Sequence, residues 1–248
     1  MSNTKIYFAS DQHFGAPNQK DSFIREKIFL DWLCEIEKDV TTLFLLGDLF
    51  DFWFEYEKVV PKGFVRILGK LASISDRGIP IYFFVGNHDL WMTDYFEKEL
   101  NIKVFHEPQF FSFNNKSFFI GHGDGKGPGD LGYKRMKKVF TSPFFQFLFK
   151  WLHPDIGVRI AQHLSIKNKL ISGKEDIHFL GKDNEWLVQY SKRKLENQYF
   201  DYSVFGHRHL PLEIPLSDTS TYFNLGDWIH YFTYGVFDGE KFELKKFR

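Results

Sequence analysis

Residues 42–51 read TLFLLGDLFD, and this stretch combines the two features that organise the whole chain. Its first half is a short apolar run, which is typical of a buried strand. Gly47 follows the run, and a glycine at that point allows the backbone to leave the strand sharply. Asp48 and Asp51 come directly after the turn. The stretch therefore predicts a buried strand that delivers carboxylates at its carboxyl end.

The same arrangement, an apolar run followed by polar side chains that bind metals, occurs four more times. The runs that we expect to be strands are 5–9, 81–85, 117–120 and 203–205. In open α/β sheets, ligand sites are built at the carboxyl ends of the strands, so segments distant in sequence can meet there. The motifs that follow these runs are Asp11-Gln12-His13, Gly86-Asn87-His88-Asp89, Gly121-His122-Gly123-Asp124 and Gly206-His207-Arg208-His209.

Two helices are expected among the first strands. One spans 21–38, with Asp21 as its candidate N-cap, and the other spans 64–75. The final part, 222–247, alternates short strands and turns, and Asp238-Gly239 indicates a hairpin. This order predicts an α/β fold, a layered sandwich within a single domain of residues 1–248. The apolar residues that recur at roughly helical spacing in the first helix are Ile24, Ile28, Leu33 and Ile36.

Composition limits the classes of function. The 248 residues are 43% hydrophobic, enough for a large core, and the formal net charge is +0. A neutral chain has no global electrostatic attraction to nucleic acid, and no obligate protein partner is indicated. The single cysteine, Cys34, excludes an internal disulfide and fits a reducing compartment. We expect neither a signal peptide nor a membrane span, which would need about 20 consecutive apolar residues.

The motifs supply two aspartates, one asparagine and four histidines as candidate metal ligands. In an Asp-x-His or His-x-His segment both side chains face the same way, because alternate residues of an extended chain do. Carboxylate, imidazole and amide ligands together suit Mn²⁺, Fe or Zn²⁺. Two such metals sharing a carboxylate are a recurring solution for hydrolysing phosphate esters and anhydrides. The candidates are Asp11, His13, Asp48, Asn87, His122, His207 and His209.

In this order, the five motifs closely resemble those of the calcineurin-like metallophosphoesterase superfamily. The resemblance implies a four-layer α-β-β-α sandwich and two divalent metal ions, with Mn²⁺ favoured and Fe or Zn²⁺ as alternatives. It implies one metal held by Asp11, His13, Asp48 and His209. It implies a second metal held by Asp48, Asn87, His122 and His207, so that Asp48 bridges.

The resemblance also implies a mechanism. A water between two cations becomes hydroxide near neutral pH and attacks phosphorus in line, while the metals offset charge on the phosphoryl oxygens. His88 faces the substrate and protonates the leaving oxygen or stabilises charge there. Asp51 is the expected partner that orients His88, and Asn87 is the third residue expected to take part in catalysis. Asp51 and Asp89 could instead serve only to stabilise turns.

The segment of residues 125–198 interrupts the strand rhythm between the fourth and fifth motifs. It contains a basic patch and then an aromatic run, and it is expected to be helical. One interpretation is a packed helical subdomain. The other is an amphipathic cap, inserted in the domain, whose basic flank meets an anionic membrane surface. The basic residues are Lys134, Arg135, Lys137 and Lys138, and the aromatic run comprises Phe140, Phe144, Phe145, Phe147, Phe149, Trp151 and Leu152.

This insertion resembles that of the UDP-2,3-diacylglucosamine hydrolases of lipid A biosynthesis, which carry an Asp eight residues after the motif histidine, as Asp130 follows His122. The resemblance implies cleavage of the substrate's pyrophosphate to UMP and 2,3-diacylglucosamine 1-phosphate, with the aromatic run lining a chamber for acyl chains. It also implies a cytoplasmic enzyme, peripheral on the inner membrane of a Gram-negative bacterium. The expected substrate contacts are Asn87, His88, Asp130, Asn168, Ser172, Lys174 and His207.

One departure leaves an alternative open. The best-known lipid A hydrolases have Arg where this chain has His88, the residue of the wider superfamily. Arg would hold a phosphate through two parallel hydrogen bonds, whereas His can also donate a proton. The alternative within enzymes is a nucleotide or dinucleoside polyphosphate phosphodiesterase of the same superfamily. The alternative outside enzymes is a scaffold that kept the fold without the chemistry.

Overall fold

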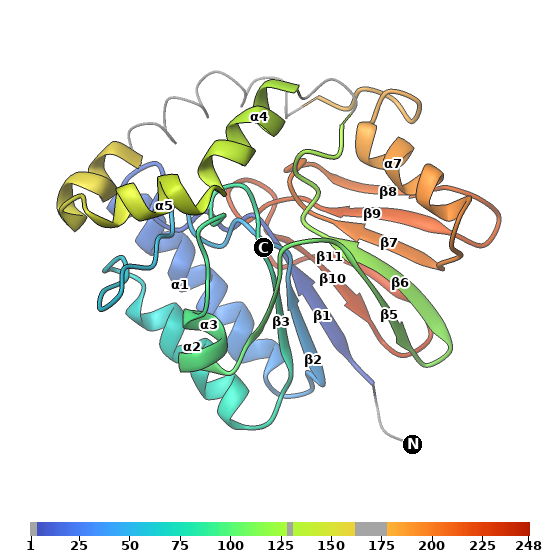
Figure 1. Ribbon diagram of the computed structural model, residues 1–248. Helices are drawn as coiled ribbons and strands as arrows, with labels where there is room; N and C mark the ends of the chain where they lie inside the picture. Colours follow the sequence, from blue (N-terminus) through green and yellow to red (C-terminus); the bar gives the residue numbers. More distant parts are fainter. Residues whose placement is uncertain (1–3, 128–130, 162–177) are drawn as a thin grey trace.

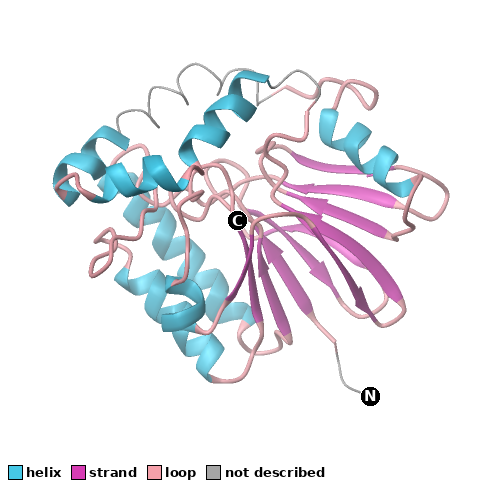
Figure 2. Ribbon diagram, in the orientation of Figure 1, coloured by secondary structure: helices cyan, strands magenta, loops and turns pink. Residues whose placement is uncertain are grey.

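Two β-sheets face one another in this protein (Figures 1 and 2). The computed structural model describes residues 4–127, 131–161 and 178–248. The first sheet is built from β1 (Ile6–Ala9), β2 (Thr42–Leu45), β3 (Ile81–Phe84), β4 (Lys103–Phe105), β10 (Thr233–Phe237) and β11 (Phe242–Lys246). The second is built from β5 (Gln109–Phe113), β6 (Lys116–Gly121), β7 (Tyr202–Phe205), β8 (Pro211–Pro215) and β9 (Thr221–Leu225).

The strand order places all the motif-bearing strands at the centres of the sheets. The first sheet runs β11-β10-β1-β2-β3-β4 and the second runs β5-β6-β7-β9-β8. The pairs β1–β2, β2–β3, β6–β7 and β7–β9 are all parallel. Parallel neighbours end at the same edge of a sheet, so the loops after these strands emerge together. The strands predicted from the sequence are confirmed, including the β10–β11 hairpin.

Helices cover the outer faces of both sheets. They are α1 (Gln19–Ile36), α2 (Val65–Asp76), α3 (Tyr95–Leu100) and α7 (Trp186–Leu195). The first three pack on the first sheet, and α7 packs on the second (Figure 1). The order of layers is therefore helix, sheet, sheet, helix, and the predicted four-layer α/β sandwich is confirmed.

The space between the sheets is filled largely by aromatic rings. Along β1 the side chains alternate, as a strand requires: Phe8 faces the second sheet, whereas Tyr7 faces the helices. Phe8 stacks on Phe44 of the same sheet at 4.9 Å and on Phe118 of the opposite sheet at 6.1 Å, measured between ring centroids. Much of the high phenylalanine content therefore serves the core between the sheets.

The start of α1 differs from the prediction. Asn18 is the N-cap, and its side-chain oxygen accepts a hydrogen bond from the Asp21 N–H at 3.0 Å. Asp21 was therefore the wrong cap, because the extended residue just before the helix is Asn18. Ile24, which the spacing assigned to the core, is 51% exposed. The buried face of the helix carries Arg25 in its first turns instead.

The region predicted as an insertion holds α4 (Leu131–Phe140), α5 (Pro143–Lys150), a helical stretch at 154–161, and α7. Figure 1 shows α4 and α5 beyond the carboxyl ends of β1–β3. Phe149 of α5 packs on Trp91 and Phe54, with ring centroids 4.6 Å apart in both pairs. In contrast, α7 belongs to the cluster on the outer face of the second sheet. No helix among the described residues is long and apolar enough to cross a membrane.

Candidate metal centre

The loops after β1 and β2 are bound to each other and carry the first candidate ligands. The Asp11 N–H donates to the Gly47 carbonyl at 3.1 Å, and the His13 N–H donates to the Asp48 carbonyl at 2.9 Å. Both Asp11 (φ 58°) and Asp48 (φ 53°) have left-handed backbone, so each leaves its strand abruptly. The bonded loops place both carboxylates over the same edge of the sheet.

Glycine at position 86 is required by the closeness of the next loop. A Cβ there would lie 2.2 Å from Asp48 Oδ1 and 2.6 Å from the Asp48 nitrogen, an overlap with main chain that no small shift would relieve. With glycine present, the loop after β3 closes onto the β2 loop, and the His88 N–H donates to Asp48 Oδ1 at 2.9 Å. The glycines of these motifs thus bring the loops within contact distance.

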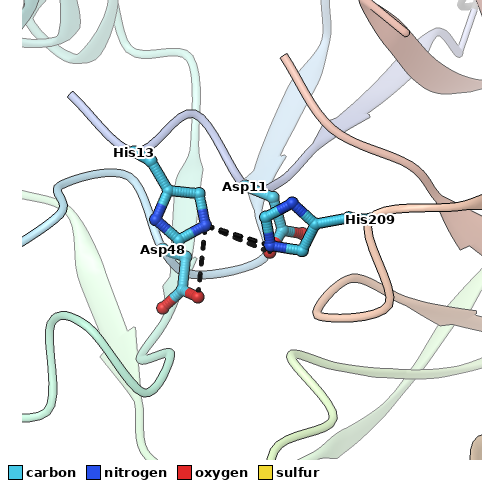
Figure 3. A group of neighbouring side chains, drawn as sticks. All are labelled: Asp11, His13, Asp48 and His209. Carbon is cyan, nitrogen blue, oxygen red and sulfur yellow. Dashed lines mark hydrogen bonds and ion pairs between the residues drawn. The ribbon is translucent and has the colours of Figure 1, made fainter. Parts of the chain in front are cut away.

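The first group of candidate ligands joins both sheets. Asp11, His13 and Asp48 come from the first sheet, His209 comes from the second, and one ligand atom of each lies within 4.8 Å of the others. Figure 3 shows the four side chains pointing toward a common centre. The Asp11 carboxylate also accepts a hydrogen bond from the His207 N–H at 2.9 Å, which ties the two sheets together at the site.

The second group shares Asp48 with the first. Asp48, His122 and His207 present ligand atoms within 4.8 Å of one another. Asn87 belongs here too, since its Oδ1 lies 3.2 Å from His122 Nε2. The structure thus brings together all seven residues that the sequence nominated, and Asp48 Oδ2 lies between His13 Nε2 at 3.6 Å and His122 Nε2 at 3.4 Å.

The hydrogen bonds of the histidines set which ring nitrogen faces the centre. His122 Nδ1 lies 2.6 Å from the Leu46 carbonyl, which can only accept, so Nδ1 carries the proton and Nε2 offers its lone pair. His209 Nδ1 faces the Asp227 carboxylate at 3.2 Å, which has the same effect. The His209 Nε2 lone pair then points at His13 Nε2, 3.1 Å away. Two nitrogen lone pairs this close repel each other unless a cation lies between them and binds both. The donor set therefore fits a divalent metal.

The electrostatics of the site also favour positive charge. Burial lowers the pKa of His122, but the neighbouring Asp48 carboxylate outweighs burial and raises that pKa to about 10. Burial alone would raise the pKa of Asp48, yet His122 beside it holds the pKa well below its ordinary value. Asp11 and Asp48 are both buried, and buried carboxylates need cationic partners.

His88 lies beside the first group rather than within it. Its ring packs edge-on against His13 at 4.7 Å, and Nδ1 donates to the Asp51 carbonyl at 3.0 Å. The Asp51 carboxylate Oδ1 lies 3.6 Å from His88 Nδ1 and 3.5 Å from His13 Nδ1. Asp51 therefore contacts both histidines, whereas the sequence had connected it with His88 alone.

Asp89 has the structural role that the sequence left open. Its two carboxylate oxygens accept hydrogen bonds from the Gly86 N–H at 2.6 Å and the Leu49 N–H at 3.1 Å. These bonds join the third motif to the second. Burial, with a contribution from Asp48, raises the pKa of Asp89 to about 8. Asp89 thus stabilises the turn that presents Asn87 and His88.

Asp227, whose carboxylate contacts Nδ1 of the candidate ligand His209, was not identified from the sequence. Its Oδ1 accepts three main-chain N–H bonds, from residues 229, 230 and 231, while Oδ2 faces His209 Nδ1. A detectable signal was present, because Gly226-Asp227 follows the apolar strand β9 just as Gly47-Asp48 follows β2. An aspartate that orients a metal-binding imidazole fixes its tautomer and raises its basicity.

Two ion pairs, one half-buried and one buried, connect the site to the helical region. Lys137 of α4 binds Asp124 of the fourth motif, with Nζ–Oδ2 2.6 Å. Arg208, between His207 and His209, binds Glu185 through two nearly parallel bonds of 2.9 and 3.1 Å. Both connections were absent from the sequence-based interpretation. The predicted substrate contacts Asp130, Asn168, Ser172 and Lys174 lie outside the described residues.

Five strand-end loops that gather seven candidate metal ligands around Asp48 are typical of a metallophosphoesterase site. The calcineurin-like phosphoesterase family profile matches residues 4–211, and the chain belongs to that family.

Several curated relatives of the chain share a name. The chain is similar to the UDP-2,3-diacylglucosamine hydrolase of Porphyromonas gingivalis strain W83, with 37% identity over 98% of this chain and 97% of the relative. The proteins of that name from Photorhabdus laumondii and Actinobacillus succinogenes are 28% and 24% identical. The Photorhabdus match covers 82% of this chain and 83% of the relative. The Actinobacillus match covers 90% and 92%.

Proposed function

We propose that this protein hydrolyses the pyrophosphate bond of UDP-2,3-diacylglucosamine, giving UMP and 2,3-diacylglucosamine 1-phosphate. The observation that carries the proposal is the assembled donor set around Asp48, in a chain that matches a hydrolase of that name along nearly its whole length. A scaffold without chemistry would have no need to keep two donor groups complete.

We propose two divalent ions, Mn²⁺ in the first instance and Fe or Zn²⁺ as alternatives. Asp11, His13, Asp48 and His209 would hold one, and Asp48, Asn87, His122 and His207 would hold the other. Bound there, the ions would supply an activated water nucleophile and offset charge on the phosphoryl oxygens. The protein's own contribution is to fix the donors in place before substrate arrives, through the Leu46 carbonyl and the Asp227 carboxylate.

We propose that His88 donates a proton to the leaving oxygen. Its side chain is partly exposed beside the first donor group, and its Nδ1–H is directed to the Asp51 carbonyl. Protonated Nε2 can then act as the acid, and the Asp51 carboxylate 3.6 Å from Nδ1 favours the positively charged ring. Asn87 and His207 are the other described residues proposed to contact substrate, and the His207 ring also contacts Trp186 at 5.6 Å.

We propose that residues 125–198 include a cap that handles the lipid part of the substrate and rests on an anionic membrane. Phe149 and Phe140 face inward against Trp91, with centroid distances of 4.6 and 5.4 Å. The remaining aromatic residues of α5 are turned outward: Phe147 is 56% exposed and Trp151, just after the helix, is 78% exposed. An apolar face of this kind suits partial insertion between lipid headgroups.

The basic patch divides into two pairs. Lys134 and Lys137 are bonded within the protein, to the Gly127 carbonyl and to Asp124. Arg135 and Lys138 are exposed on the same helix, where each could contribute about 1 kcal/mol of attraction to an anionic surface. The proposed location is accordingly the cytoplasmic face of the inner membrane of a Gram-negative bacterium.

The test is Mn²⁺-dependent release of UMP from UDP-2,3-diacylglucosamine in mixed micelles. A dinucleoside polyphosphate and an aryl phosphodiester are assayed in parallel. Asp48→Asn should abolish turnover, whereas the matched variant Asp238→Asn, at the exposed β10–β11 hairpin, should retain it. Rapid turnover of the soluble nucleotide without UMP release from the lipid substrate would favour the phosphodiesterase alternative and overturn the lipid assignment.

A further inference from the structure

Arg25 is a buried arginine at an unusual place on α1. It is 6% exposed and lies on the helix face that packs on the first sheet, the face that carries Phe29 and Trp32 farther along. Burying a guanidinium costs free energy unless its donors are satisfied. Its partners are therefore informative about why an arginine occupies this buried position.

Three hydrogen bonds of Arg25 end on main-chain carbonyls of a single loop. Nε donates to the Gln12 carbonyl at 2.6 Å, and Nη2 donates to the His13 carbonyl at 2.6 Å and the Ala16 carbonyl at 2.5 Å. This is the loop after β1, which carries Asp11 and His13. The rigid fork of one guanidinium thus binds three carbonyls of the loop that carries two candidate ligands.

The backbone of that loop includes two residues in an unfavourable conformation. Asp11 (φ 58°) and His13 (φ 46°) both have left-handed backbone, which costs a residue with a side chain about 1–2 kcal/mol. Such conformations persist where the surrounding structure over-determines them. Two N–H groups of the segment bind the β2 loop, and Arg25 binds carbonyls of the same segment.

We propose that Arg25 is a positioning residue for the first metal group: by binding the carbonyls of residues 12, 13 and 16, it fixes the loop that aims Asp11 and His13. The inference rests on the proposed metal site but not on the identity of the substrate. Lysine cannot replace it fully, because an ammonium lacks the planar fork that reaches several carbonyls at once. The members of the second group all lie on other loops, although the His207 N–H donates to the Asp11 carboxylate, so the second group should be affected less than the first.

The experiment measures binding of Mn²⁺ alone to the full-length, chelator-treated protein, with free Mn²⁺ followed by electron paramagnetic resonance. Arg25→Gln is compared with wild type and with Arg66→Gln, an exposed arginine on the adjacent helix α2. Arg25→Gln should weaken one of the two Mn²⁺ sites about 10- to 100-fold, the range seen when support of a metal ligand is lost. Arg66→Gln should bind both ions as wild type does.

The site that weakens is identified in an Asp11→Asn background, which lacks the first group. There, Arg25→Gln should cause no further loss of Mn²⁺ affinity. If Arg25→Gln does not fold, Arg25→Lys takes its place, with a smaller loss at the same site and turnover of an aryl phosphodiester restored by added Mn²⁺. Wild-type affinity at both sites, or equal weakening of both, would overturn the proposal. Failure to release UMP from the lipid substrate would leave these binding results unchanged, so the two proposals fail separately.

Discussion

Asp227→Asn should weaken metal binding through the tautomer of His209. The two carboxylate oxygens have different partners: Oδ1 accepts three main-chain N–H bonds of 2.7–3.1 Å, and Oδ2 lies 3.2 Å from His209 Nδ1 and 3.1 Å from His230 Nδ1. An asparagine keeps one oxygen, which the three N–H groups claim. Its NH₂ group then faces His209 Nδ1 as a donor, which favours the tautomer with the proton on Nε2. That proton occupies the position where the metal should bind.

Loss of this support predicts a 10- to 100-fold weaker affinity at the first metal group, which is about 1.4–2.7 kcal/mol because each tenfold change is about 1.4 kcal/mol. The assay is the Mn²⁺ dependence of aryl phosphodiester hydrolysis, together with direct Mn²⁺ titration. Asp238→Asn is the matched control, since Asp238 Oδ1 also accepts two main-chain N–H bonds, of 2.9 and 2.8 Å, but in an exposed hairpin. A folded Asp227→Asn protein with wild-type Mn²⁺ affinity would refute the reasoning.

Three further outcomes are expected. Glu185→Ala should destabilise the protein by about 3–5 kcal/mol in urea unfolding, because it leaves the buried Arg208 guanidinium without its carboxylate; a loss below about 1 kcal/mol would contradict this. Phe8→Ala should cost about 3–5 kcal/mol, whereas Phe147→Ala should change stability by no more than about 0.5 kcal/mol and instead reduce co-sedimentation with anionic vesicles. Asp201→Asn should remove part of the acid sensitivity of stability: burial raises the pKa of Asp201, but hydrogen bonds from the start of β6 and Lys116 outweigh it and lower the pKa. A lowered folded-state pKa stabilises the protein above the unfolded-state value and is lost as pH falls through the folded-state value, so the variant and wild type should differ at pH 7 and converge near pH 2.

The fold was largely predictable because strand and turn signals coincide. Each motif follows an apolar run, and a glycine marks the exit, as at Gly47. Residue type and spacing predicted the ends and the buried faces of helices less reliably. The spacing assigned Ile24 to the core, but the helix face that packs in the core carries Phe29 and Trp32, and Trp32 contacts Tyr7 of β1. That rotation exposes Ile24 and buries Arg25.

The sequence predicted which candidate ligands would lie together, but it did not predict the residues that support them. Residues that bind metals have a recognisable type and position, which is why Asp48 and His122 could be named in advance. Residues that support them, such as Asp227 and Arg25, act through contacts between segments distant in the sequence. No local pattern specifies that Arg25 reaches the carbonyls of a loop nine to thirteen residues before it.

The amino-acid sequence by itself determined which side chains are available for metal binding and that they follow strands, because those properties depend on residue type and near neighbours. Only the tertiary structure decided that Asp48 lies between two donor groups. It also decided which imidazole nitrogens face the centre and which charged side chains contact those imidazoles. These depend on the parallel pairing of strands and on the two sheets facing one another. Asp11 and His207 are far apart in the chain, yet this arrangement places the Asp11 carboxylate and the His207 N–H within about 3 Å, the range of a hydrogen bond.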